Sequence, residues 1–303
     1  MSGTISNGLS ALLAAQRALQ TTSNNIANAN TEGFVRQRVD FTENPSSPIG
    51  GFTIGSGVSV GSISRIYDQF LTDNLRTATS LEQRADAFND FAARINTVLG
   101  NPDTGVNTAV QRFFNQVEAV GRDPTSAAQR NQLLLEGENL AERLQQIDSQ
   151  LGGISNDINS RLGLAAGTIN TLAGQIADLN GQITAAGSSA ASDLLDRRDL
   201  ALKQLGAQIN ITTIRQNDGS VNVLVGSGQS LVLGVDSATL HTVQDPYDSS
   251  RLQIAISSGG PLQNISSVIS GGTTGGLLSF RNDVLDSARR DLGLLSMGLA
   301  DAF

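Results

Sequence analysis

Residues 140–186 read LAERLQQIDSQLGGISNDINSRLGLAAGTINTLAGQIADLNGQITAA, and this stretch decides the fold. Apolar residues recur in it at alternating intervals of four and three, with one additional interval of four between Ile158 and Leu162. This spacing is a heptad repeat with a single stutter, which locally relaxes a left-handed supercoil. We call these positions the bundle seam: Leu140, Leu144, Ile147, Leu151, Ile154, Ile158, Leu162, Ala165, Ile169, Leu172, Ile176, Leu179, Ile183 and Ala186.

The seam predicts one helical rod that begins near Thr125. A helix of about 60 residues would be about 90 Å long at the α-helical rise. Several glycines lie inside the rod, and each costs about 1 kcal/mol relative to alanine. We therefore expect other helices to cover the seam. The alternative is two helices that break at Gly152 and Gly153, but the apolar spacing keeps its phase across this pair, which favours one rod.

The composition excludes several classes of partner and site. The net charge is −8, and an acidic chain without basic clusters argues against nucleic acid and anionic membranes as partners. The chain has no Cys, which excludes disulfides and thiol chemistry. No apolar run approaches the roughly 18 residues of a membrane span, and the first 20 residues lack the features of a cleaved signal peptide. We expect a soluble chain that, if exported, uses a route without such a signal.

The first element is a predicted helix over residues 4–29. A narrow apolar stripe runs along it at four-three spacing, with Gln16 and Ser23 filling the polar positions. Such a helix is marginal alone in water, so we expect the stripe to bind a partner, the alternative being an ordinary amphipathic helix that packs on its own domain. We call this stripe the assembly stripe: Ile5, Leu9, Leu12, Leu19 and Ile26.

A hairpin and two shorter helices follow. The Asn-rich stretch 23–33 ends the first helix, residues 36–42 alternate like a strand, residues 44–48 read as a turn, and a second strand follows near Val58 to Ile63. Helices are predicted at 67–99, with Leu71, Leu81 and Phe88 on its apolar stripe, and at 106–120. Asp123 and Pro124 suggest the start of the long rod. Three helices with short connections indicate an antiparallel bundle.

The chain then changes from α to β and back. A short helix at 193–205 carries two i,i+4 pairs, Asp193 with Arg197 and Asp199 with Lys203. Strands are predicted at 211–216, 220–225, 230–235, 239–243 and 252–256, with a hairpin turn at residues 218–219. After the glycine-rich residues 271–276, helical spacing resumes and continues to the last residue in mid-heptad, which suggests a truncation.

The predicted fold class is therefore mainly α with an inserted β region: an elongated antiparallel helical bundle or coiled coil plus an antiparallel β module. The predicted organisation is an N-terminal coiled-coil helix at 1–30, a hairpin or linker at 31–66, a long bundle at 67–206, the β module at 207–270, and a returning, truncated bundle helix at 271–303.

No residue pattern indicates catalysis, a cofactor or a metal site. His241 is the only histidine, so neither a catalytic triad nor a His-based metal site can be built. Asp193, Asp196 and Asp199 fit a solvated helix face better than a metal site. The glycines at 271–276 precede a helix but lack the lysine and order of a phosphate-binding loop. We expect a non-enzymatic chain; a catalytic β module is a weaker alternative.

The Asn-rich stretch resembles the N-terminal signature of the axial proteins of the bacterial flagellum. That signature is an amphipathic helix ending in Ser-Asn-Asn-Ile-Ala-Asn-x-Asn-Thr-x-Gly-Phe/Tyr. The matching residues are Asn24, Asn25, Ile26, Asn28, Asn30, Thr31, Gly33 and Phe34. The segments 193–199, 217–223 and 275–281 further resemble the N-terminal portion of the hook-associated protein 1 family.

The resemblance implies a structural protein of the hook–filament junction. The first helix would lie in the inner tube of the flagellum, paired with a C-terminal helix, and the β module would face outward. Copies of the chain would form a ring between the hook protein and a second junction protein, as a mechanical adaptor. The family is exported by the flagellar type III route, with an export chaperone on the missing C-terminal part. The rival interpretation is a secreted coiled-coil adhesin or effector exported the same way.

Overall fold

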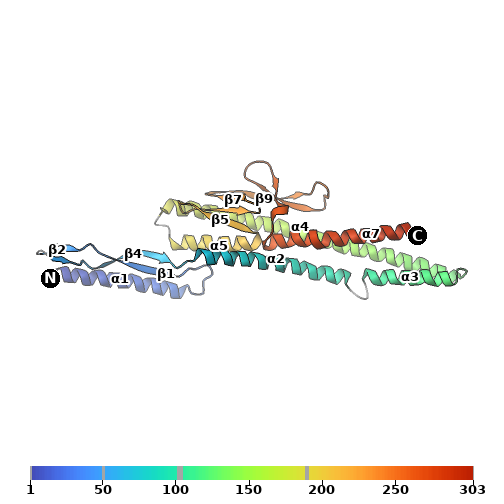
Figure 1. Ribbon diagram of the computed structural model, residues 1–303, viewed down its shortest axis with the longest axis horizontal. Helices are drawn as coiled ribbons and strands as arrows, with labels where there is room; N and C mark the ends of the chain where they lie inside the picture. Colours follow the sequence, from blue (N-terminus) through green and yellow to red (C-terminus); the bar gives the residue numbers. More distant parts are fainter. Residues whose placement is uncertain (1, 50–51, 101–104, 188–190, 303) are drawn as a thin grey trace.

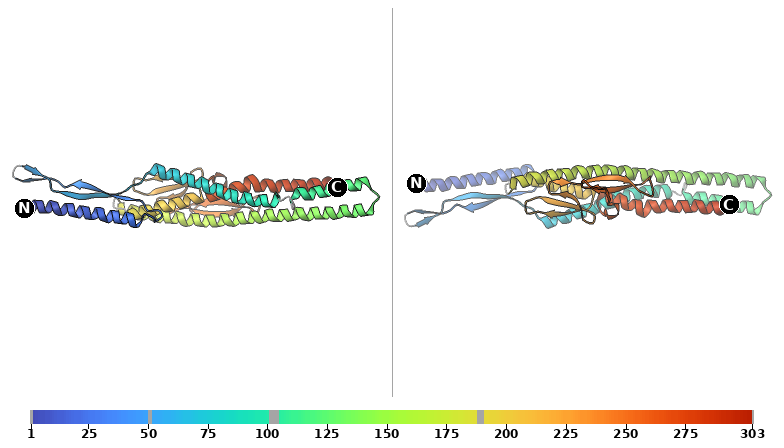
Figure 2. Two further views of the ribbon diagram at one scale, coloured as in Figure 1. Left: turned by 90° about the horizontal axis from the view of Figure 1, so that it is seen from below. Right: turned by 90° about the horizontal axis from the view of Figure 1, so that it is seen from above.

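The computed structural model describes residues 2–49, 52–100, 105–187 and 191–302. The molecule is long and narrow (Figures 1 and 2), with an arm at one end and a bundle that extends to the other. The predicted fold class, mainly α with an inserted β region, is confirmed.

The axis of the bundle is the helix α4, Ala127–Ala186. It is unbroken across Gly152 and Gly153, so the two-helix alternative is wrong. Its N-cap is Ser126, whose Oγ accepts a hydrogen bond from the Gln129 N–H at 3.3 Å. The expected cap at Asp123 is wrong, because Asp123 instead ends the preceding helix.

The other helices run against α4. Helix α2, Gln69–Leu99, and helix α3, Val106–Arg122, lie end to end and run in the same direction (Figure 1). Helix α5, Ser192–Gln208, also runs opposite to α4. The final helical segment runs in this direction too, and it consists of α6, Gly272–Phe280, a π-helical turn, Arg281–Leu285, and α7, Asp286–Ala302. The expected alternation of three antiparallel helices is therefore wrong, because α2 and α3 together form one side of the bundle.

The predicted apolar stripe of helix α2 is buried only in the second half of the helix, where Phe88 packs against the core beside the buried Ile95. Leu71 and Leu81 are exposed, whereas Arg76, Ala87 and Phe91 are buried. The buried face packs mainly on α6, which begins at residue 272 rather than after the glycines. A Cβ on Gly276 would overlap the carbonyl oxygen of an α2 residue, so this glycine permits close packing of α6 on α2.

The β region consists of two antiparallel sheets. One has the order β5 (Ile211–Arg215), β6 (Val221–Val225), β7 (Gln229–Leu233) and β8 (Asp236–Ser237). The other has the order β11 (Gln263–Asn264), β10 (Leu252–Ser257) and β9 (Thr239–Gln244), and a 3₁₀ turn, Ser266–Val268, follows it. Gly219 has φ +86°, as the predicted turn between β5 and β6 requires.

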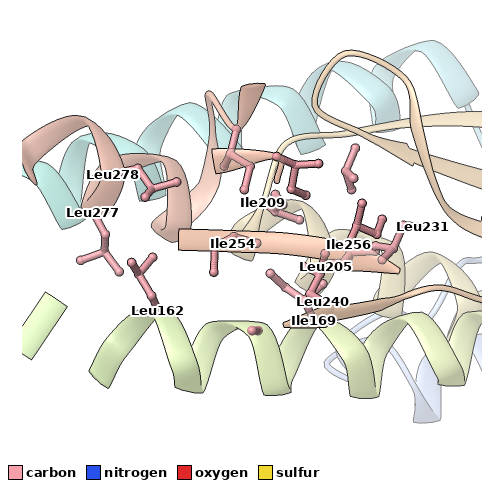
Figure 3. Packing of buried hydrophobic residues seen from close by; sticks show 14 of the residues in the cluster. Leu162, Ile169, Leu205, Ile209, Leu231, Leu240, Ile254, Ile256, Leu277 and Leu278 are labelled. Carbon is pink, nitrogen blue, oxygen red and sulfur yellow. The ribbon is translucent and has the colours of Figure 1, made fainter. Parts of the chain in front are cut away.

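One continuous core joins helices and sheets. Leu162 and Ile169 of α4 face Leu277 of α6 and apolar residues of β9 and β10 (Figure 3). Other helices cover the seam, as expected, but strands, which the apolar spacing does not indicate, also cover part of its second half.

Three asparagines of α4 attach the sheets to the helix. Asn170 donates a hydrogen bond to the Leu240 carbonyl oxygen at 2.9 Å and accepts one from the same residue's N–H at 2.7 Å. Asn180 pairs in the same way with both backbone groups of Val221. Asn159 contacts the backbone at the start of β10. Each side-chain amide therefore makes the hydrogen bonds to the strand backbone that a neighbouring strand would otherwise make.

The arm contains α1, Ser2–Ala27, and a long β-hairpin. Strand β1, Gln37–Glu43, pairs with β4, Val58–Arg65, and further out β2, Ser47–Ile49, pairs with β3, Phe52–Ile54. The expected turn at 44–48 is wrong at its end, because pairing resumes at Ser47. Helix and hairpin lie side by side in both views of Figure 2.

Candidate functional site

Helix α1 has two opposite faces of different character. The assembly stripe, Ile5, Leu9, Leu12, Leu19 and Ile26, is exposed to between 56% and 72%. The opposite face, Asn7, Ser10, Ala14, Ala18, Thr21, Asn25 and Asn28, is buried or half-buried. The residues of each face lie three, four or seven positions apart, so each face runs straight along the helix.

The polar face of α1 binds the hairpin through side chains. Asn25 donates a hydrogen bond to the Gln37 carbonyl oxygen at 2.8 Å and accepts one from the Gln37 N–H at 2.9 Å. Nearer the tip, Ser10 Oγ accepts a hydrogen bond from the Val58 N–H at 3.3 Å. The hairpin therefore covers the polar face and leaves the assembly stripe uncovered by the described residues.

The signature residues form the reversal between α1 and β1. Asn28 donates to the Asn24 carbonyl oxygen and side chain at 3.0 and 2.8 Å, and Thr31 donates to the Asn28 side chain at 3.2 Å. The Phe34 N–H donates to the Thr31 carbonyl oxygen, while Asn30 is exposed in the turn. Gly33 has φ +82°, a conformation that favours glycine.

The base of the arm is joined to α5 by a buried ion-pair cluster. Arg65 Nη2 lies 2.7 Å from Asp196 Oδ1 and 2.7 Å from Asp199 Oδ2. The three side chains are only 9–12% exposed. Asp196 Oδ2 also accepts a hydrogen bond from the Val35 N–H at 3.2 Å. Burial raises the pKa of the Asp196 carboxyl, and the Val35 N–H and Arg65 act in the opposite direction.

Arg198, between these carboxylates in the sequence, contacts different parts of the chain. Its Nη1 donates to Asn180 Oδ1 of α4 at 3.1 Å and to the Gly219 carbonyl oxygen of the β5–β6 turn at 2.7 Å. Its pKa is lowered, chiefly by burial. The residues around Asp196 thus contact the arm, the long helix and a sheet.

The expected solvated face of α5 is therefore wrong for Asp196 and Asp199. The predicted pair of Asp199 with Lys203 is also wrong, because Lys203 Nζ instead lies 3.1 Å from Glu32 of the arm. The available signals for this cluster were an arginine at a strand end and a carboxylate that follows two leucines. Local periodicity, however, does not pair residues that lie so far apart in the sequence.

The structure buries most of the bundle seam. The buried members are Leu140, Ile147, Leu151, Ile154, Ile158, Leu162, Ala165, Ile169, Leu172, Ile176, Leu179 and Ile183. Leu144 is half-buried and Ala186 is exposed. These residues hold the bundle together, whereas the assembly stripe is an exposed apolar surface of the arm.

The described residues were also compared with the requirements of a histidine site, a metal site and a membrane span. His241 is exposed on β9, opposite Ala255 of β10. Within the described residues, no group of three or more histidine or carboxylate side chains could hold a metal ion. None of the described helices has the length and hydropathy needed to cross a bilayer.

Comparison with known proteins gives a family. The helical-domain model of the flagellar hook-associated protein FlgK matches residues 92–303, which is more than half of the chain. The chain belongs to this family. Residues 5–34 also match the model of the flagella basal body rod protein, so the FlgK match and the rod-protein match together include most of the bundle, the β region and α1.

Relatives of known identity agree with the FlgK assignment. Flagellar hook-associated protein 1 of Escherichia coli (strain K12) is 32% identical over 100% of this chain and 56% of its own length. The protein of the same name from Bacillus subtilis (strain 168) is 28% identical over 80% of this chain and 50% of its own. The chain therefore spans about half the length of these relatives.

A solved FlgK structure has the same architecture. The flagellar hook junction protein FlgK from Burkholderia pseudomallei is 31% identical, with a TM-score of 0.68 over 73% of this chain and 41% of that one.

Proposed function

We propose that the chain is a structural component of the bacterial flagellum that assembles as a ring at the hook side of the hook–filament junction. In this position it would act as a mechanical adaptor between the hook protein and a second junction protein. Membership of the FlgK family and the rod-protein match at residues 5–34 support this proposal.

The assembly stripe of α1 is the observation that carries the proposal. Five large aliphatic side chains in one line are exposed to more than half of their area. Contiguous exposed apolar surface of this kind marks an interaction site. Since the hairpin already occupies the opposite face, the stripe is free to pack on further helices, from another copy or from another segment of the full-length protein.

The remaining partner and location assignments belong to the same proposal. The subunit would contact copies of itself, the hook protein and a second junction protein, outside the cell. It would be exported through the flagellar type III route with a chaperone bound to the C-terminal part of the full-length protein. The absence of Cys agrees with export in an unfolded state.

Substitution of the assembly stripe tests the proposal. A strain that lacks the protein should carry hooks without filaments in electron micrographs, and should release flagellin into the medium. The full-length protein with Leu9→Asp and Leu12→Asp should fail to restore filaments, because a helix interface does not accept two buried carboxylates.

Ala11→Asp is the matched control, because Ala11 is exposed on the same helix and lies neither three nor four residues from any residue of the assembly stripe. It should restore filaments. Normal filaments with the Leu9 and Leu12 double variant, at equal secreted amounts, would refute the role of the stripe.

A further inference from the structure

Within the described residues, one covalent connection joins the arm to the bundle. Strand β4 ends at Arg65 and α2 begins at Gln69, so residues 66–68 alone join the two parts. A connection of three residues has several rotatable backbone bonds and would by itself allow the arm to swivel. What fixes the orientation of the arm must therefore lie in non-covalent contacts at its base.

We propose that Asp196, Arg198 and Asp199 of α5 form a bracket that locks the arm to the bundle, so that both turn as one rigid body. This inference concerns the geometry of the isolated chain and does not depend on the proposed flagellar function. It assigns a role to the segment 193–199, which the assembly stripe does not use.

The helical spacing of the three residues gives the bracket its two sides. Residues three apart share a helix face, whereas a residue two apart points elsewhere. Asp196 and Asp199 accordingly face the arm and hold Arg65, while Arg198 contacts Asn180 of α4 and the β5–β6 turn. The same helix turn is thus fixed to the bundle on one side and holds the arm on the other.

The connecting residues are held as well. The guanidinium groups of Arg65 and Arg215 each lie 5.1 Å from the centre of the Tyr67 ring. Arg215 belongs to β5, so Tyr67 is held between the arm and a sheet of the bundle. The one covalent connection therefore cannot rotate without breaking these contacts.

The end of the family signature forms the arm's side of the bracket. A Cβ on Gly33 would lie 3.1 Å from Leu200 Cβ, so a larger residue would push the arm away from α5. Val35 donates its N–H to Asp196, and Glu32 pairs with Lys203. The end of the signature thus contacts α5 at the base of the arm, in addition to forming the reversal after α1.

Pulsed electron paramagnetic resonance on the purified chain tests the bracket. The chain has no Cys, so spin labels attached to Ala11→Cys and Thr168→Cys report one distance between α1 and α4. Both positions are exposed. The parent should give one narrow distance distribution. Arg65→Met should abolish the narrow peak and give a broad distribution, with an unchanged far-ultraviolet circular dichroism spectrum.

Arg38→Met is the matched control. It removes an ion pair between Arg38 and Asp40 in the same hairpin, whose side chains are 66% and 38% exposed. It should leave the narrow distance unchanged. A narrow, unshifted distance in Arg65→Met would overturn the proposal.

Gly33→Ala tests the bracket by a different route, in case Arg65→Met fails to fold. It alters no charge, and should shift or broaden the same distance because the added methyl group meets Leu200 and because alanine disfavours the φ of +82° at this position. An unshifted, narrow distance in Gly33→Ala would show that close contact with α5 does not set the orientation of the arm. In either variant, these results leave the filament assay above as a separate test of function.

Discussion

Leucine-to-alanine substitution at two nearby positions of α4 measures whether the bundle seam is the core of the rod. Leu162 is fully buried, whereas Leu164, two residues later in the same helix, is 73% exposed. Leu162→Ala removes three buried carbon atoms, worth about 0.8 kcal/mol each, and leaves a partly unfilled cavity. We therefore expect a loss of about 3–4 kcal/mol in the free energy of unfolding.

Leu164→Ala makes the same chemical change at the surface and should alter the free energy of unfolding by less than about 0.5 kcal/mol. Urea unfolding followed by far-ultraviolet circular dichroism gives both values, with the slope against urea concentration as a check that the unfolded states match. Equal midpoint shifts for the two variants would refute the register of the rod, because they would require both faces of α4 to be equally buried.

Three further predictions concern the backbone, the asparagines and a titrating turn. Gly167→Ala should raise the melting temperature, because this helical glycine has open space around its missing Cβ and alanine stabilises a helix by up to about 1 kcal/mol relative to glycine. Gly276→Ala should lower the melting temperature, because the added Cβ overlaps α2 and reduces the free energy of unfolding by about 2 kcal/mol. Asn180→Ala leaves both backbone groups of a β6 residue without their side-chain partner, so urea unfolding should give a loss of about 3 kcal/mol; a loss below about 1 kcal/mol would contradict this. Hydrogen bonds from Ser220 lower the pKa of the Asp218 carboxyl below its ordinary value of 3.8, so their stabilisation is present above that pH and is lost as the pH falls through the lowered pKa. Nuclear magnetic resonance titration of Ser220→Ala should show the Asp218 pKa returning toward 3.8, and an unchanged pKa would contradict the assignment.

The elements that depend on local pattern could be predicted from the sequence. The heptad spacing of residues 140–186 identifies a helix that the structure extends from Ala127 to Ala186. Alternating residues and the turn at Gly219 locate the strands, because strand period and turn conformation are properties of neighbouring residues.

The buried face of the first half of α2 could not be predicted, for a physical reason. There the buried face includes Ser80 and also Arg76, which donates hydrogen bonds to Asp73 and Thr213, while Leu71 and Leu81 remain exposed. An apolar period identifies the buried face only where polar residues stay outside.

The contacts of the bracket at the base of the arm also could not be predicted from local sequence patterns. Arg65 and Asp196 are far apart in the chain, and each alone resembles an ordinary surface charge. Their burial follows from how the hairpin docks on α5, which no spacing within either element encodes. The spacing within α2 and α3 likewise does not encode that the two helices run in the same direction.

The asparagine contacts between helices and strands have a consequence for chemical ageing. Deamidation begins when the backbone nitrogen of the next residue attacks the side-chain amide carbon, which requires that side chain to rotate. Asn180 precedes Gly181, the residue that hinders this attack least. Because Val221 holds its amide at both the oxygen and the nitrogen, Asn180 is kept out of the reactive geometry. The fold thereby protects this amide bond, a useful property for any protein that must last long after synthesis.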